Sequence, residues 1–375
     1  MKWAIFLFIF FSFLNNAICQ WTHCYSSDES LTSIYADTTG LVLVGGMSGA
    51  LLKSKDFGGT FRRVETNTQS EFQKIIKVND SLIVARVGSN HPVIGWKLFV
   101  STDEGETWLS NNSPNFNFHQ LQFVDGALYI MPWANNGGRN DIYKSIDNGK
   151  TWNKINQIPK LEAINKLLIV NDSCWYAIGN TGFIGYTSDM GLNWKEQAQG
   201  LAYAKLLDII KVHDTVAVIV GDYEIPTSRY YPILTTLYNK DEWIGVSSLN
   251  FYQGGKFSHS GKYWWITTDF QNGMEFSNSI KNWEGMKLEL RQSLSELTWI
   301  DNRGNGFALL YNSILKTINH GIDPLSVKEE SIQDGYITEY EYYNTIGQRV
   351  SASRNQLLLK VNKRFGKVEK VVFSE

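Results

Sequence analysis

The sequence SIDNGKTW, residues 145–152, is one of four segments in this 375-residue chain that share a single pattern. The pattern is Ser/Thr-x-Asp-x-Gly-x-Thr/Asn-Trp/Phe, and its other copies are SKDFGGTF (54–61), STDEGETW (101–108) and TSDMGLNW (187–194). Asp accepts hydrogen bonds from the backbone of its own turn, Gly permits a positive φ, and an aromatic ring packs between neighbouring sheets. We therefore expect four hairpin turns with structural aspartates and packed tryptophans: Asp56, Asp103, Asp147, Asp189, Trp108, Trp152 and Trp194.

The spacing of these segments indicates a repeating unit of about 42 residues. The closing aromatic residues stand at 61, 108, 152 and 194, and the period continues to Trp243, Trp283 and a decayed segment, TINHGIDP (317–324). Self-similarity at such a period is typical of repeat architectures. Each unit also contains apolar runs with little polar alternation, which predicts strands buried on both faces. Seven units then occupy residues 31–327, and a count of six would leave one of the last three out.

The repeated segment resembles the Asp-box, or BNR repeat, of sialidases, sortilin-type receptors, xyloglucanases and photosystem II assembly factors. The resemblance implies an all-β fold, a seven-bladed β-propeller of four-stranded blades in which Asp-box turns join the third and fourth strands. Closure of the ring then needs a strand from the other end of the chain. Residues 20–24 are placed to add an outer strand to the last blade, where Trp21 would stand for the missing Asp-box tryptophan.

Residues 1–19 have the layout of a secretory signal peptide. Lys2 is followed by an apolar run from Trp3 to Leu14, which is too short to span a bilayer as a helix. We expect cleavage after Cys19, and the alternative is a lipoprotein in which this cysteine is acylated. No other stretch is apolar enough to cross a membrane, so no transmembrane segment is expected after cleavage.

Residues 329–375 leave the repeat period and follow the propeller domain of residues 20–328. Three short strands are expected, over 343–350, 356–361 and 366–375. The run YNTIGQ (343–348) and the strands after it resemble the C-terminal sorting domain of the type IX secretion system of Bacteroidota. The resemblance implies a secreted or cell-surface protein of a Gram-negative bacterium, with a tail that engages the secretion machinery. The tail departs from the family because no Gly precedes its second strand, and the alternative is a small β extension packed on the propeller.

The composition excludes several classes of function. The formal net charge is −2, so no nucleic-acid partner is expected. The six histidines are scattered and no Cys/His spacing resembles a metal site, so we expect no metal and no cofactor. Cys24 and Cys174 lie in different units, which favours two unpaired buried thiols over the alternative of a disulfide.

Ligands are expected on the face opposite the Asp-box turns, where the loops between the second and third strands open. Three of these loops are long, over residues 88–96, 133–140 and 222–231. The candidate ligand-binding residues in them are His91, Trp96, Trp133, Asn135, Arg139, Tyr223, Arg229 and Tyr230. An alignment of the inner strands adds a ring of channel-mouth residues, of which the second, third and fourth are also binding candidates: Thr32, Lys74, His119, Lys166, Asp208, Gln253 and Ser295.

The sequence favours a non-catalytic propeller that binds a glycan or a protein through the loop-rich face of blades 2, 3 and 5. The alternative is a glycoside hydrolase, sialidase-like or polysaccharide-cleaving, with Asp208 and Glu224 as its carboxylates. A sialidase needs three convergent arginines, and Arg86, Arg139 and Arg229 lie in or near suitable loops. The Arg-Ile-Pro signature of sialidases is absent, however, and xyloglucanases of this repeat class use two tandem propellers.

Overall fold

The computed structural model describes a large part of the chain, with gaps. The described residues are 21–89, 95–111, 114, 117–132, 140–159, 164–197, 204–223, 233–238, 240, 242–246, 255–268, 273–277, 280, 284–287, 294–318, 340–343, 349–350, 357–362 and 368–372. The predicted signal peptide lies outside them. The chain divides into two compact units, Met1–Ser326 and Val327–Glu375, and each is described by itself. Within the described ranges, no helix is long and apolar enough to cross a membrane.

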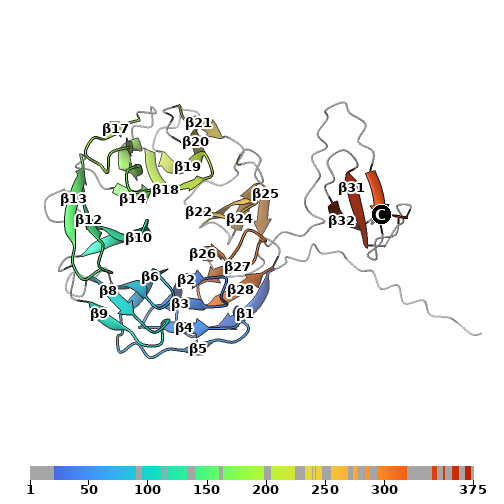
Figure 1. Cartoon of the computed structure of the whole chain (residues 1–375), viewed down its shortest axis with the longest axis horizontal. Helices are drawn as coiled ribbons and strands as arrows, with labels where there is room; N and C mark the ends of the chain where they lie inside the picture. Colours follow the sequence, from blue (N-terminus) through green and yellow to red (C-terminus); the bar gives the residue numbers. More distant parts are fainter. Residues whose placement is uncertain are drawn as a thin grey trace, which may run out of the picture. The chain divides into compact units, whose positions relative to one another are not determined.

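The first unit is a seven-bladed β-propeller, seen down the axis of its ring in Figure 1. Seven antiparallel sheets of four strands stand around a common centre, and in six of them the strands run in chain order from the centre outward. The all-β fold and the count of seven blades expected from the sequence are confirmed.

Blades 1 to 4 each use four consecutive strands. They are β2 (Leu31–Ala36), β3 (Val42–Gly46), β4 (Leu51–Ser54) and β5 (Arg62–Arg63); β6 (Glu71–Lys77), β7 (Ile83–Gly88), β8 (Trp96–Ser101) and β9 (Leu109–Asn111); β10 (Phe118–Val124), β11 (Ala127–Pro132), β12 (Asn140–Ser145) and β13 (Asn153–Ile158); and β14 (Ile164–Ile169), β15 (Trp175–Gly179), β16 (Ile184–Thr187) and β17 (Lys195–Glu196). A single turn of 3-10 helix, η2 (Asn180–Gly182), joins β15 to β16. The second strands β3 and β15 are buried along their whole length, as the apolar runs predict.

Blades 5 and 6 follow the same order, and blade 7 takes one strand from the start of the chain. The strands are β18 (Ala204–Val212), β19 (Thr215–Tyr223), β20 (Ile233–Leu237) and β21 (Ile244–Val246); β22 (Gly255–His259), β23 (Trp264–Thr268), β24 (Gly273–Ser277) and β25 (Glu284–Lys287); and β26 (Leu294–Trp299), β27 (Gly306–Leu310), β28 (Ser313–Thr317) and β1 (Thr22–Ser26). The pairing of β1 with β28 closes the ring and confirms the closing strand expected from residues 20–24. Blade 7 thus combines strands from the two ends of the propeller unit, which holds the ring closed.

The four Ser/Thr-x-Asp-x-Gly segments form turns of one geometry, here called the Asp turns. In the first, the Asp56 carboxylate accepts hydrogen bonds from the hydroxyls of Ser54 (2.6 Å) and Thr60 (2.7 Å) and from the Thr60 backbone N–H (2.9 Å). Equivalent bonds surround Asp103, Asp147 and Asp189. These aspartates are therefore fully used within their own turns, as expected of structural residues.

The glycine of each Asp turn is needed both for its backbone and for its lack of a side chain. Gly58 has a φ of +74°, and a Cβ there would lie 2.7 Å from the Phe307 ring of blade 7. Gly105 has a φ of +81° and faces Leu43 of blade 1 in the same way. The Asp turns of blades 1 and 2 thus pack on the second strand of the blade before them, which joins the local motif to the ring.

Cys24 and Cys174 are not bonded to each other, which confirms the expected free thiols. Both are half-buried rather than buried. They cannot cross-link because Cys24 lies in β1 of blade 7 and Cys174 just before β15 of blade 4.

The second unit contains one antiparallel sheet of four strands. These are β29 (Tyr340–Tyr343), β30 (Arg349–Val350), β31 (Leu357–Asn362) and β32 (Val368–Val372), in the order β30-β29-β31-β32. The single strand expected over residues 343–350 is wrong, because Tyr343 pairs with Arg349 as the two sides of an antiparallel pair. Asn344 and Gly347 between them are residues that favour turns.

Candidate functional site

The loop-rich face is the side of the propeller where the inner strands begin and the second strands run into the third. Most of the binding residues predicted there lie outside the described residues: His91, Trp133, Asn135, Arg139, Glu224, Arg229 and Tyr230. Tyr223 ends β19, and its side chain is likewise outside the description. The part of this face that the structure describes consists of the inner strands and the turns of blade 1.

Trp96 does not offer an open ring to a ligand, which corrects its predicted role. The side chain is only 3% exposed, and the Arg86 guanidinium lies over its ring at 4.0 Å from the centroid. Its backbone N–H donates to Asn117 Oδ1 at 2.8 Å. Trp96 is the first residue of β8 and is held beneath Arg86 as part of the interior.

Six of the seven inner strands carry a β-bulge near their loop-rich ends. The pairing with the second strand skips a residue in β2, β6, β10, β14 and β26, and skips twice in β18. The residues that directly follow the bulge, here called the ring positions, are Ser33, Lys74, Gln120, Lys166, Asp208 and Glu296. The sequence alignment therefore placed Thr32, His119 and Ser295 one residue too early, because they are the unpaired bulge residues; Gln253 lies outside the described residues.

Ring-position side chains join several neighbouring blades. Glu296 of blade 7 accepts a hydrogen bond from the Ile34 N–H of blade 1 at 3.0 Å, Gln120 accepts one from Leu167 at 2.8 Å, and Asp208 accepts one from Phe257 at 2.7 Å. These bonds use backbone donors of the next inner strand, which lies at a sheet edge and has no further strand to pair with. The ring is thus fastened at its centre by polar side chains as well as by the apolar contacts between blades.

Lysines complete the charge balance of the same ring. Lys74 Nζ lies 3.3 Å from Glu296 Oε1, Lys166 forms an ion pair with Asp208, and Lys256 donates to the Ser295 carbonyl at 3.2 Å. Each of the two ring carboxylates therefore holds one ammonium group and one backbone N–H. Asp208 is also buried, with 4% of its surface exposed. A carboxylate held in this way is poorly placed to protonate or attack a substrate, which weakens the predicted hydrolase role of Asp208.

His119 lies beside this ring on blade 3 and is neutral at physiological pH. Burial, and to a smaller extent the positive charge of Arg86, lower the pKa of its imidazole to about 4. Its Nε2 lies 3.2 Å from Gln120 Nε2. The three ring residues predicted to bind a ligand, Lys74, His119 and Lys166, thus lie at one end of the propeller centre, and two of them are already engaged with carboxylates.

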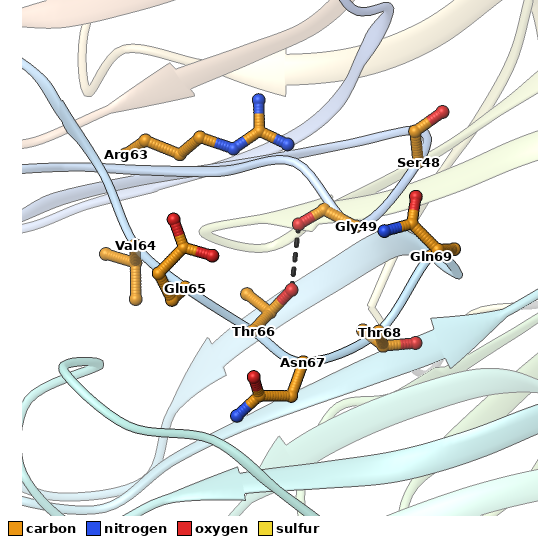
Figure 2. Close-up of a pocket in the computed structure, with 9 residues that line it drawn as sticks. All are labelled: Ser48, Gly49, Arg63, Val64, Glu65, Thr66, Asn67, Thr68 and Gln69. Atoms are coloured by element: carbon orange, nitrogen blue, oxygen red, sulfur yellow. Dashed lines mark hydrogen bonds between the residues drawn. The ribbon is translucent and has the colours of Figure 1, made fainter.

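A polar cavity of about 280 Å³ opens on the loop-rich face at blade 1 (Figure 2). It is built from the turn between β3 and β4 and from the segment that leads out of β5 towards blade 2, and its lining is Ser48, Gly49, Arg63, Val64, Glu65, Thr66, Asn67, Thr68 and Gln69. The lining is hydroxyl, amide, charged and backbone groups, with Val64 as its one apolar side chain. Sequence reasoning missed this site because no residue in it stands out from an ordinary turn.

The two walls of this cavity are held at a fixed distance. Thr66 Oγ1 donates to the Gly49 carbonyl at 2.9 Å, drawn as the dashed line in Figure 2. Arg63 on the rim is held by Glu29 at 2.5 Å. Ser48 and Asn67 both have a φ of +53°, a left-handed conformation that non-glycine residues seldom adopt and that recurs at binding sites. The cavity is therefore a preformed hydrogen-bonding surface.

No group of three or more His, Cys, Asp and Glu side chains among the described residues is arranged to hold a metal ion. A second hollow, of about 370 Å³, lies at the closing seam between β1, the end of β28 and the first Asp turn. It is on the face opposite the loop-rich one, so it is not continuous with the cavity of blade 1.

Comparison with solved structures places the propeller among proteins of varied activity. YCF48 bound to D1 peptide superposes with a TM-score of 0.61 at 12% identity, over 80% of this chain and 96% of that one; a YCF48 from Cyanidioschyzon merolae is also similar. Virginiamycin B lyase from Staphylococcus aureus gives 0.62 at 13%, over 79% and 97%. The GH74 xyloglucanase from Xanthomonas campestris gives 0.58 at 10%, over 94% of this chain and 61% of that one.

These identities establish the fold and nothing about activity. No family model matches the chain, and no curated protein matches it in sequence. The similar structures include a protein solved with a peptide and a glycoside hydrolase, so the choice between binding and catalysis rests on the residues of this chain.

Proposed function

We propose that this chain is a non-catalytic recognition module that binds a polypeptide partner through its loop-rich face. The observation that carries the proposal is the state of the ring carboxylates. Asp208 and Glu296 are each held by a lysine and a backbone N–H, so the inner strands that the structure describes present fixed hydrogen-bonding groups at the centre of this face and neither of these two carboxylates is free. Retaining and inverting hydrolysis both need two carboxylates free to act on the scissile bond.

The cavity of blade 1 favours a polypeptide over a glycan. The cavity is lined by hydroxyl, amide and backbone groups that can donate and accept hydrogen bonds. The main chain of an extended polypeptide is recognised chiefly through such bonds. A sugar ring is more often held on an exposed aromatic face, and no aromatic side chain lines this cavity. Buried Trp96 does not supply one either. The similar structure of YCF48 with a bound peptide agrees with this use of the fold.

The proposal also covers the repeat class and the cellular location of the protein. The Asp turns carry the residues of the Asp-box, and we assign the repeats to that class. We further propose that residues 1–19 direct export and that residues 329–375 act as a sorting tail for secretion to the surface of a Gram-negative cell. Deletion of residues 329–375 is then expected to leave the propeller inside the cell envelope, as measured by surface proteolysis and fractionation.

The binding function is tested by screening the full-length exported protein against a random-peptide display library and a glycan array, with released sugar measured in parallel. Selected peptides should bind the parent and lose affinity on Asn67→Ala in the cavity, while Ile146→Ala on the opposite face leaves affinity unchanged. Release of sugar that is lost in Asp208→Asn would overturn the proposal in favour of a hydrolase. Binding to glycans alone would replace the polypeptide with a carbohydrate ligand.

A further inference from the structure

Arg86 is a buried cation close to the loop-rich end of its strand. It lies two residues before the end of β7, and only 7% of its surface is exposed. Its Nη1 donates to the Phe118 carbonyl of blade 3 at 3.2 Å, and its guanidinium is stacked on the ring of Trp96. The group therefore sits in the seam between blades 2 and 3.

The charge of Arg86 is not matched by an ion pair among the described residues. A guanidinium has five N–H donors, and this one makes a single hydrogen bond to the residues that the structure describes. Glu71 acts on it only at longer range, and burial raises the pKa of the Glu71 carboxyl. Burial lowers the pKa of Arg86 itself to about 10, which leaves it protonated at neutral pH. A buried charge without a close counter-ion is costly, and such an arrangement is rare unless a ligand completes it.

The surroundings of Arg86 are rigid. Asn117 fixes the Trp96 backbone, and Gly88 lets Gly95 approach so closely that an added Cβ would lie 2.0 Å from the Gly95 carbonyl oxygen. The aromatic platform under the guanidinium therefore holds it in one plane. A planar guanidinium whose remaining donors have no hydrogen-bond partner among the described residues matches a carboxylate, which it can bind through two parallel hydrogen bonds.

We propose that Arg86, supported by Trp96, is a subsite for one carboxylate of an acidic side chain in the partner polypeptide. The inference rests on the proposed function and specifies its ligand: the segment bound on the loop-rich face carries Asp or Glu where it crosses the seam between blades 2 and 3. Neighbouring His119 stays neutral and does not compete for the anion. Lys74, the register partner of Arg86, is already paired with Glu296.

The test uses the full-length protein with fluorescein-labelled octaglutamate as the probe and octaglutamine as its uncharged match. We expect octaglutamate to bind and octaglutamine not to bind. Arg86→Met should weaken octaglutamate binding at least about tenfold, the effect of losing a charge-assisted hydrogen bond. Lys97→Met, which removes an exposed cation from the neighbouring strand β8, should leave the affinity unchanged. Equal affinity of the parent and Arg86→Met would overturn the subsite.

Two further measurements separate a binding role from a structural one. Without ligand, Arg86→Met should unfold at the same temperature as the parent or a higher one, since it removes an uncompensated buried charge. In the parent, the His119 pKa followed by NMR should rise when octaglutamate binds, because the bound carboxylate offsets the charge of Arg86. If Arg86→Met fails to fold, two other results decide the inference. It stands if the His119 pKa of the parent rises on binding and Arg86→Lys weakens binding. Otherwise Arg86 is structural and the inference fails.

Failure of this inference can be told apart from failure of the proposed function. Display-selected peptides that bind without acidic residues would overturn the carboxylate subsite and leave the recognition module standing. An oligogalacturonate that binds in an Arg86-dependent manner, while octaglutamate does not bind, would overturn the polypeptide source of the carboxylate.

Discussion

Trp21, at the start of the described chain, lies edge-on against Trp265 of blade 6, with ring centroids 6.4 Å apart and planes at 85°. It also contacts Trp299 of blade 7, with centroids 5.8 Å apart. Trp21 thus packs on the second strand of the preceding blade, as the Asp turns of blades 1 and 2 do. The residue next to the closing strand β1 therefore joins blade 7 to blade 6.

Trp21→Ala is expected to weaken the closing seam. Loss of a buried tryptophan costs about 3–5 kcal/mol, and its exposed fraction of 9% places Trp21 in this class. Urea unfolding should show the loss, whereas Tyr311→Ala, at an exposed residue, should change the free energy of unfolding by less than about 0.5 kcal/mol. A loss below about 1 kcal/mol for Trp21→Ala would mean that strand pairing alone closes the ring.

The Asp turns should make stability depend on pH in the acidic range. The Thr151 hydroxyl, the Thr151 backbone N–H and the Ser145 hydroxyl together lower the pKa of Asp147 to about 2, against about 3.9 in an unfolded chain. Because the folded pKa is the lower one, this stabilisation is present above about pH 4 and is lost as the pH falls towards 2.

Asp147→Asn should therefore reduce stability at pH 7 and cease to matter near pH 2. Urea unfolding of parent and variant at the two pH values provides the measurement. Asp80→Asn, at an exposed aspartate in a different kind of turn, is the control. Its free energy of unfolding should equal that of the parent at both pH values. An Asp147→Asn deficit that persists unchanged at pH 2 would contradict an electrostatic origin.

Sequence reasoning succeeded where one local motif carries the information. The turn around Asp147 can be predicted from eight residues because the hydrogen bonds that its carboxylate accepts lie within them, and four copies at a similar spacing then imply a ring. The closing strand could be expected because blade 7 lacks an outer strand of its own. These features depend on composition and spacing, which are visible without coordinates.

The centre of the ring could not be predicted in the same way. The bulge in β10 adds one residue to the pairing, so an alignment by pattern chose His119 where the structure uses Gln120. The hydrogen bond from the Ile34 N–H to Glu296 joins the first blade to the last, and no local sequence pattern predicts it. Trp96 seemed a loop aromatic because it follows a long loop, yet stacking under Arg86 buries it. Long-range contacts decided each of these cases.

Glu296 offers a way to separate charge from hydrogen bonding in the ring. Glu296→Gln keeps an acceptor for the Ile34 N–H but removes the charge that faces Lys74, whose side chain is largely exposed. Exposed ion pairs contribute at most about 1 kcal/mol, so this variant should lose little stability. Glu296→Ala also leaves the backbone donor without a partner and should cost about 1–3 kcal/mol. Equal losses in the two variants, measured by thermal and urea unfolding, would assign the whole effect to the ion pair.

Gly49→Ala should close the cavity of blade 1 and strain its walls. The residue has a φ of +71°, and an added Cβ would lie 1.8 Å from the Thr68 carbonyl oxygen, so the segment from Thr66 to Gln69 must move. Strain at a left-handed position costs of the order of 1–3 kcal/mol, and the clash adds to it. The variant should unfold at a lower temperature and bind display-selected peptides more weakly. Gly126→Ala is the matched control, because its φ of +79° carries the same backbone strain while nothing lies near its Cβ. If Gly126→Ala impairs peptide binding as much as Gly49→Ala does, the cavity is not where the peptide is held.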